Sequence, residues 1–266
     1  MGEVYLHGHH DSVLRSHRWR TAENSAGYLL AHLPPDAHVL DVGCGPGTIT
    51  VDLAARVPAG QVTGIDAAPD VLAIARQEAE RRGRPNVRFE TGDAYHLAFA
   101  DGTFDVVHAH QVLQHLSDPA GALAEMRRVC RPGGLIAARD GDYGGMFWFP
   151  EDPELAEWQA LYRDVARALG GEPDAGRRLL AWAHAAGFAG VEASASVWCY
   201  TGPTDRAWWG ESWAERLTES VFGDRATEAG LATREDLRRL ARAWRRWAAS
   251  EDGWFLIPNG EILCRV

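Results

Sequence analysis

Residues 39–48 read Val39-Leu-Asp-Val-Gly-Cys-Gly-Pro-Gly-Thr48, and they are the most informative segment of the chain. Its first four residues form a short apolar segment that predicts a buried strand, and residues 48–57 have the periodicity of a helix. The glycines between them allow the backbone to turn sharply and to approach a ligand closely. The helix beyond such a turn begins with free N–H groups. The stretch therefore predicts a strand, a ligand-binding turn and a helix.

The alternation of short apolar segments with helical segments continues to residue 139. This pattern is typical of βαβ units, which build a parallel sheet with helices on both faces. The further strands predicted in this part are 61–66, 87–91, 104–109 and 134–139, and the further helices are 21–33, 69–82 and 119–129.

Beyond Asp140 the regular alternation of short strands and helices ends. We expect helices over 153–169, 174–186, 204–222 and 233–249, and a strand over 191–200. The final segments, 254–257 and 261–266, flank Pro-Asn-Gly260, which predicts either a hairpin or one bent edge strand.

The composition excludes several classes of protein. Of the 266 residues, 46% are hydrophobic and 24% are charged, which is ordinary for a globular chain that needs no disulfide or metal to fold. A net charge of −10 argues against broad binding to nucleic acid or anionic membranes. All 27 basic residues are arginine, which excludes a lysine Schiff base. Widely spaced cysteines, with no secretory segment or long apolar run, predict a cytoplasmic protein with reduced thiols.

Asp66 ends the strand that follows the glycine turn, 19 residues beyond Gly47. A carboxylate at this place can accept both hydroxyls of a ribose. A dinucleotide and S-adenosylmethionine both contain a ribose, so both stay open. The dinucleotide fingerprint needs a third glycine where this chain has Thr48. The carboxylate of Asp41 suits a cationic ligand and would repel a pyrophosphate, which favours S-adenosylmethionine.

Residues 39–48 resemble motif I of the class I S-adenosylmethionine-dependent methyltransferases, of the UbiE/LaeA-like group. Further segments resemble the later motifs of that family in order and spacing. They are Thr63-Gly-Ile-Asp66, Glu90-Thr-Gly-Asp-Ala94, Phe104-Asp-Val-Val107, Val112-Leu-Gln-His-Leu116 and Arg128-Val-Cys-Arg-Pro-Gly-Gly134. The resemblance implies an α/β fold with a Rossmann-like, seven-stranded mixed sheet of order 3-2-1-4-5-7-6, helices on both faces and an antiparallel last strand.

The resemblance also implies a domain organisation. Residues 35–202 and 254–266 would form the methyltransferase core, and residues 1–34 an N-terminal lid and helix over the cofactor. Residues 203–253, where the resemblance is nearly absent, would be a helical, Trp-rich insertion that caps the substrate. The implied partner is a small-molecule acceptor, and binding to nucleic acid or to a membrane is not expected. The protein is expected to be a monomer or a homodimer.

The implied cofactor is S-adenosylmethionine, with S-adenosylhomocysteine as the product. The family pattern assigns residues at the strand ends to its methionine, ribose and adenine parts, and residues of the N-terminal segment to a lid. The expected cofactor-binding residues are Tyr5, Arg20, Asp41, Gly43, Gly45, Asp66, Ala67, Asp93, Ala94, His110 and Gln111.

Methyl transfer is a direct displacement, so alignment of the reactants supplies much of the rate. An oxygen or nitrogen acceptor often also needs a base. Similar proteins that methylate hydroxyls use a His–Asp pair, which here corresponds to His115 as the base and Asp140 as its orienter. The alternative is that His115 only packs the pocket. We expect O-methylation, with N- or C-methylation, a nucleotide-dependent oxidoreductase and a non-catalytic cofactor-binding protein as alternatives.

Aromatic residues after the fifth strand are candidates for the acceptor pocket, although a helical core would use them equally well. The expected substrate-binding residues are His10, Asp142, Tyr143, Phe147, Trp208, Trp209 and Trp213. No metal is expected, although His7, His9 and His10 and the pair Asp140 and Asp142 leave that alternative open. The Arg-rich helix 233–249 predicts a solvated face, with membrane or partner binding as the alternative.

Overall fold

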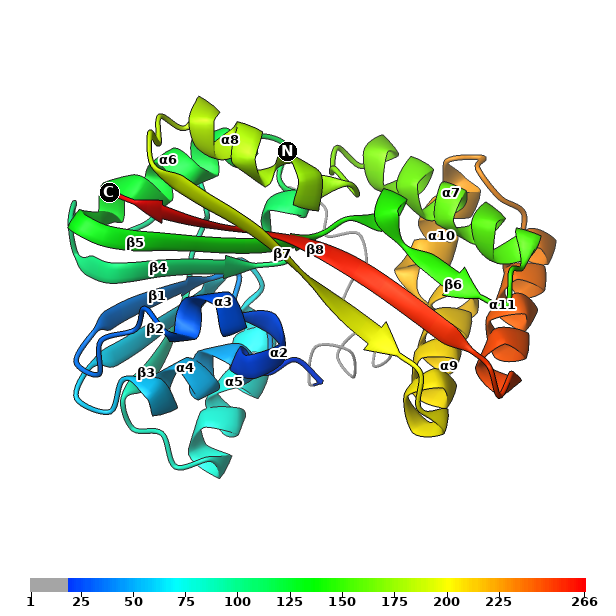
Figure 1. Cartoon of the computed structure of the whole chain (residues 1–266), viewed down its shortest axis with the longest axis horizontal. Helices are drawn as coiled ribbons and strands as arrows, with labels where there is room; N and C mark the ends of the chain where they lie inside the picture. Colours follow the sequence, from blue (N-terminus) through cyan, green and yellow to red (C-terminus); the bar gives the residue numbers. More distant parts are fainter. Residues whose placement is uncertain (1–18) are drawn as a thin grey trace.

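The structure, a computed structural model, describes residues 19–266. Within them lies an eight-stranded sheet with the order β3-β2-β1-β4-β5-β8-β6, and β7 pairs with β8 beside this path (Figure 1). The strands are β1 His38–Val42, β2 Gln61–Asp66, β3 Val87–Thr91, β4 Phe104–His110, β5 Cys130–Gly141, β6 Phe147–Phe149, β7 Val191–Tyr200 and β8 Trp254–Arg265.

The first five strands are parallel. Their register aligns Asp41 on β1 with Gly64 on β2 and with His108 on β4. The carboxyl ends of β1, β2, β3 and β4 therefore meet at one edge of the sheet. Open α/β sheets bind their ligands at this edge.

Alternate residues of the strands face two opposite helical layers, because side chains alternate across a strand. Val39 packs in a cluster with α2, α3 and α4, whereas the next residue, Leu40, packs in a cluster with α6 and α8. The helices that cover the sheet are α2 Ala22–Ser25, α3 Gly27–Leu30, α4 Thr48–Arg56, α5 Pro69–Arg81, α6 Pro119–Val129 and α8 Leu179–Ala185.

The C-terminal segment is one long strand, so of the two alternatives left open around Pro258 the single strand is correct and the hairpin is wrong. β8 is also not an edge strand, because β7 pairs with one side of it while β5 and β6 share the other side. β5 pairs with residues 259–265 and β6 with residues 254–256. Pro258 falls between these two partners, where its missing N–H costs no ladder bond. With β8 as the seventh family strand and β7 as the sixth, the predicted order is confirmed, and β6 is an addition.

Three predicted helices are divided in the structure. The segment 21–33 breaks at Ala26 into α2 and α3, and Thr21 caps α2 by accepting a hydrogen bond from the Asn24 N–H. The segment 174–186 begins as a 3-10 turn, Ala175–Arg178, before α8. The segment 204–222 ends early because the Ser220 hydroxyl accepts from the Phe222 N–H and starts a new helix.

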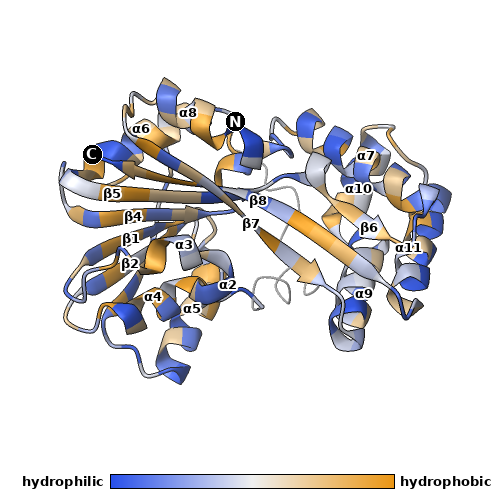
Figure 2. Ribbon diagram, viewed as in Figure 1, coloured by the Kyte–Doolittle hydropathy of each residue, from blue (hydrophilic) through white to orange (hydrophobic). Residues whose placement is uncertain are grey.

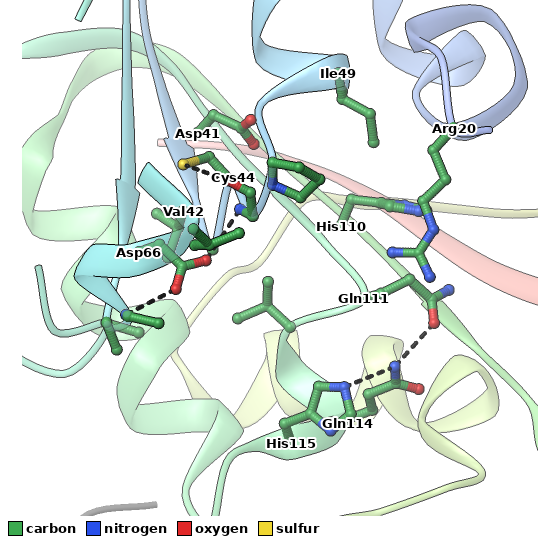
Figure 3. A pocket seen from close by; sticks show the side chains of 18 of the residues that line it. Arg20, Asp41, Val42, Cys44, Ile49, Asp66, His110, Gln111, Gln114 and His115 are labelled. Atoms are coloured by element: carbon green, nitrogen blue, oxygen red, sulfur yellow. Dashed lines mark hydrogen bonds between the residues drawn. The ribbon is translucent and has the colours of Figure 1, made fainter. Parts of the chain in front are cut away.

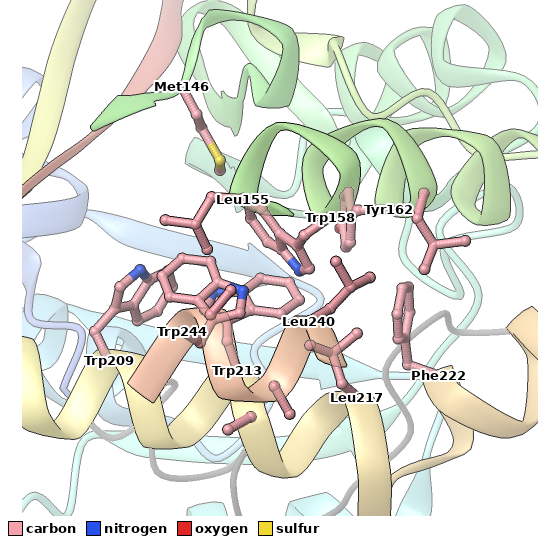
Figure 4. Close-up of a cluster of buried hydrophobic side chains, with 14 of the residues drawn as sticks. Met146, Leu155, Trp158, Tyr162, Trp209, Trp213, Leu217, Phe222, Leu240 and Trp244 are labelled. Atoms are coloured by element: carbon pink, nitrogen blue, oxygen red, sulfur yellow. The ribbon is translucent and has the colours of Figure 1, made fainter. Parts of the chain in front are cut away.

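A helical lobe extends from the distal parts of β6, β7 and β8 (Figure 1). Residues between β7 and β8 form α9 Pro203–Glu219, α10 Val221–Glu228 and α11 Arg234–Ala249, and α7 Pro153–Ala168 packs with them. Trp158 is at the centre, with ring centroids 4.5 Å from Trp213 and 4.7 Å from Trp244 (Figure 4). This aromatic core, which includes α7 as well as the 203–253 segment, holds the lobe together.

The outer face of α11 is polar, whereas its inner face is apolar (Figure 2). Arg239 pairs with Glu157 of α7 at 2.5 Å, and Arg245 pairs with Glu211 of α9 at 2.6 Å. The arginines thus link neighbouring helices, as expected for a solvated face. Among residues 19–266, every helix is too short or too polar to cross a membrane.

Candidate active site

The turn between β1 and α4 is built from glycines in left-handed backbone. The φ angles are +69° at Gly43, +52° at Gly45 and +79° at Gly47, values that residues with a Cβ disfavour. A Cβ at Gly47 would also lie 2.8 Å from the Cβ of Ala75. The turn therefore depends on glycine both for its conformation and for its packing against α5.

Asp66 lies at the carboxyl end of β2, directly beside this turn. One carboxylate oxygen accepts a hydrogen bond from the Gly45 N–H and the other accepts from the Ala68 N–H, both at 3.0 Å. Two backbone donors thus set the orientation of the carboxylate. Each oxygen keeps a further lone pair that can accept from a ligand.

A cavity of about 890 Å³ opens at this edge of the sheet (Figure 3). Its size is in the upper part of the range for ligand pockets, about 300–1,000 Å³. Every described residue that the sequence assigned to the cofactor lines it: Arg20, Asp41, Gly43, Gly45, Asp66, Ala67, Asp93, Ala94, His110 and Gln111. The fold therefore gathers these residues around one space.

Side-chain amides cross the floor of the cavity. Gln114 donates to Gln111 at 2.9 Å, and Gln111 donates to Asn259 of β8 at 2.8 Å. Gln111 has a φ of +57°, the only positive value at a non-glycine residue among residues 19–266. A glutamine with left-handed backbone is strained. The hydrogen bonds of its side chain to Gln114 and Asn259 hold it in place.

His115 lines the cavity, and the Gln114 amide lies 3.2 Å from its Nε2 (Figure 3). Burial, followed by the charge of Arg20, lowers the pKa of His115 to about 3. The imidazole is therefore neutral at neutral pH.

Asp140 does not orient the His115 ring directly. Its Oδ1 accepts from the Gln114 N–H at 3.2 Å, and its Oδ2 has no hydrogen-bond partner among the described residues. The carboxylate is fully buried behind the cavity wall, and burial raises its pKa to about 7. Asp140 thus supports the backbone turn that carries His115, which corrects the predicted side-chain pair.

Comparison with known proteins identifies the family. A family model described as a methyltransferase domain matches residues 33–210, which run from before β1 into α9. The chain belongs to this methyltransferase family. It is an S-adenosylmethionine-dependent methyltransferase, as the motif resemblance predicted.

Two relatives and one solved structure illustrate the similarity. An uncharacterized methyltransferase from Schizosaccharomyces pombe is 34% identical, over 97% of this chain and 95% of its own length. A demethylmenaquinone methyltransferase from Deinococcus radiodurans is 40% identical over 44% of this chain and 47% of that protein. The YcgJ protein from Bacillus subtilis shares the fold, with a TM-score of 0.59 and 21% identity over 90% of this chain and 96% of that chain.

Of the residues expected to bind the methyl acceptor, Tyr143 and Trp209 line the cavity of the methyltransferase. Trp208 lies behind the wall, stacked on Trp19 with centroids 5.9 Å apart. Trp213 is fully buried in the aromatic core of the lobe, because it lies one helical turn beyond Trp209 and faces α7 and α11.

Two other expected acceptor residues also lie away from the cavity wall. Asp142 is buried in an ion pair with Arg177 at 2.5 Å, so its charge is used within the fold. Phe147 is half-exposed on β6 and its ring packs against Trp254. Sequence proximity to the fifth strand therefore did not bring these two side chains into the site.

The wall of the methyltransferase cavity also includes residues that were not predicted from the sequence. Trp198 and Tyr200 of β7, Arg216 of α9 and Trp19 line it, together with Gln114. Two signals could have found some of them. Trp198 and Tyr200 alternate on a predicted strand and so share a face. Arg216 lies seven residues after Trp209, which places both on one side of a helix.

Tyr5 and His10, and the histidines His7 and His9, lie outside the described residues. Within residues 19–266, no group of three or more His, Cys, Asp or Glu side chains is arranged to hold a metal ion.

Proposed function

We propose that this methyltransferase transfers a methyl group from S-adenosylmethionine to a hydroxyl group of a small-molecule acceptor. The supporting observation is one cavity whose lining includes the glycine turn and Asp66 as well as His115 and several aromatic residues. When bound, the cofactor supplies a sulfonium methyl group for direct displacement. Holding donor and acceptor in line supplies much of the rate.

The residues around the glycine turn fit this cofactor by their donor and acceptor chemistry. The lone pairs left on Asp66 suit the ribose hydroxyls. The carboxylate of Asp41, which lines the cavity beside the turn, suits an ammonium or sulfonium charge. Asp93 and Ala94, just beyond β3, are assigned to the adenine. The remaining members of the cofactor set are Arg20, Gly43, Gly45, Ala67, His110 and Gln111.

In this proposal the hydroxyl group of the acceptor binds next to His115. In the transfer, the hydroxyl oxygen forms a bond to the methyl carbon, the carbon–sulfur bond breaks and its electron pair goes to sulfur, and the hydroxyl releases its proton. The neutral His115 ring can accept that proton. A ring whose pKa is lowered to about 3 is a weak base, so a phenol, with a pKa of about 10, would release its proton to this ring more readily than an aliphatic alcohol would.

The helical lobe is assigned to the acceptor. Trp209 and Arg216 of α9 line the cavity opposite the glycine turn, so residues 203–253 would act as a cap on the methyltransferase core of 35–202 and 254–266. Residues 1–34 are assigned to a lid. A cytoplasmic monomer or homodimer agrees with this assignment.

Calorimetric titration tests the proposal. Wild-type protein, Asp66→Ala and a control, Asp101→Ala on an exposed loop, are titrated with S-adenosylmethionine, S-adenosylhomocysteine and NADH. We expect the first two ligands to bind to the wild type and the control, and affinity to fall at least about tenfold in Asp66→Ala. Binding of NADH alone would overturn the proposal in favour of an oxidoreductase.

The atom that receives the methyl group is tested with catechol, aniline and indole as acceptors and mass spectrometry of the products. We expect O-methylation, lowered about 100-fold or more in His115→Gln. Methylation at nitrogen or carbon alone would overturn the hydroxyl assignment and leave the cofactor assignment intact.

A further inference from the structure

The charges that line the cavity are separated. Among its described lining residues, the carboxylates are Asp41, Asp66 and Asp93, and all lie at or just beyond the carboxyl ends of β1, β2 and β3. The guanidinium groups are those of Arg20 and Arg216. The strand ends therefore favour a cation, and Arg216, on α9 of the lobe, favours an anion.

Arg216 is a buried charge in the wall of the lobe. It is only 4% exposed, and its guanidinium carbon lies 4.8 Å from the ring centroid of Trp213 and 5.8 Å from that of Trp209. Cation–π contacts with two indoles restrict the movement of the guanidinium. A planar guanidinium can bind a carboxylate with two parallel hydrogen bonds.

Arg20 and Arg216 act on the same part of the cavity. Burial raises the pKa of Tyr200, and the positive charges of Arg20 and Arg216 oppose this rise. Arg216 has the same effect on Tyr143, and Arg20 also acts on His115. Arg20 projects into the cavity toward Gln111 in Figure 3. Both arginines therefore lie near Tyr143 and Tyr200, and Arg20 also lies near His115, the group assigned to the acceptor hydroxyl.

The walls between these charges are aromatic. Tyr200 and Trp209 are stacked with centroids 4.5 Å apart and an interplanar angle of 6°. Trp19, Trp198 and Tyr143 line the same region. Flat, apolar walls of this kind suit a planar ring.

We infer that the acceptor is an aromatic hydroxy acid, whose ring lies against the aromatic walls and whose carboxylate binds Arg216. This inference rests on the proposed function, because it places the hydroxyl at His115. It adds the chemical class of the substrate. The low basicity of His115 agrees with a phenolic hydroxyl.

The inference is tested by binding of two probes to protein saturated with S-adenosylhomocysteine. The probes are 3-hydroxy-2-naphthoate and its neutral methyl ester, which have the same rings and hydroxyl and differ in charge. We expect the wild type to bind the acid about 10- to 100-fold more tightly than the ester. Equal affinities, or tighter binding of the ester, would overturn the inference without need of a variant.

Variants of Arg216 locate the carboxylate. Arg216→Met removes the charge and keeps an apolar side chain of similar length, whereas Arg216→Lys keeps the charge. Arg245→Met, on the exposed pair with Glu211, is the matched control. We expect the preference for the acid to fall below about twofold in Arg216→Met, to be partly retained in Arg216→Lys and to be unchanged in the control. A preference that persists in folded Arg216→Met would overturn the assignment.

Binding of S-adenosylhomocysteine is measured first in each protein, which separates the two proposals. Absence of this binding in the wild type contradicts the proposed function, and with it the inference. Binding of S-adenosylhomocysteine without a preference for the acid contradicts the inference alone.

Discussion

The Nδ1 of His108 lies 2.7 Å from the Oδ1 of Asp41, and both side chains are buried between β4 and β1. The other oxygen of Asp41 accepts a hydrogen bond from the Thr50 hydroxyl at 2.6 Å. Asp41 also lines the cavity. Hydrogen bonds from two elements thus set the orientation of a carboxylate that we assign to the cationic part of the cofactor.

His108→Phe keeps a ring of similar size and removes the hydrogen bond to Asp41. We expect the affinity for S-adenosylmethionine to fall about 5- to 20-fold. A hydrogen bond to a charged group contributes about 1.5–3 kcal/mol, and the remaining hydrogen bond from Thr50 still orients Asp41 in part. Calorimetry provides the measurement. His38→Phe, at an exposed position of β1, the strand of Asp41, is the control, and equal affinities of the two variants would contradict the role of His108.

Replacement of Gln111 separates strain from function. Gln111→Gly relieves the strain of the left-handed backbone, whereas Gln111→Ala keeps it. Both variants remove the side-chain hydrogen bonds to Gln114 and Asn259. We expect the glycine variant to be more stable than the alanine variant by about 1 kcal/mol, measured by urea unfolding, while both bind ligand more weakly than the wild type. An alanine variant as stable as the glycine variant would show that the backbone is unstrained.

Asp140 predicts a specific dependence of stability on pH. Its pKa is raised from 3.8 to about 7 by burial, so between these values the folded state keeps a proton that the unfolded state has lost. Its contribution to stability is therefore present at low pH, falls as the pH rises to about 7 and is constant above that.

Asp140→Asn cannot ionise and keeps an acceptor for the Gln114 N–H. We expect the free energy of unfolding of this variant, relative to wild type, to increase by about 2 kcal/mol between about pH 5.5 and about pH 8, since one pKa unit corresponds to about 1.4 kcal/mol. Urea unfolding at both pH values measures the difference. Parallel pH profiles for the two proteins would mean that Asp140 is ionised throughout.

Trp213 and Phe147 differ in their expected effect on stability. Trp213→Ala leaves a cavity in the aromatic core of the lobe and should lower the free energy of unfolding by about 3–5 kcal/mol. Phe147→Ala removes a half-exposed ring and should lower it by less than about 1 kcal/mol. Thermal and urea unfolding of both variants test this, and similar losses would contradict the assignment of Trp213 to the core.

The resemblance of the sequence motifs to the methyltransferase family was sufficient for the strand order and for the residues that we assign to the cofactor. The glycine turn, Asp66 and the residues after β3 and β4 each adjoin the carboxyl end of a parallel strand, so their neighbourhood follows from the topology. The helix ends were less predictable, because single hydrogen bonds between a side chain and the backbone, at Asn24 and Ser220, decide where a helix begins.

The sequence by itself determined which strands are parallel and which side chains meet at their carboxyl ends, since periodicity and turn chemistry act over a few residues. The part of the cavity that we assign to the acceptor could be seen only in the folded chain. There Trp198 and Tyr200 of β7, Trp209 and Arg216 of α9, and His115 come from distant parts of the chain. Whether an aromatic residue of the lobe lines the cavity or fills the core depends on which elements pack against its turn of the helix. Trp209 lines the cavity, whereas Trp213, one turn further along α9, packs against Trp158 and Trp244.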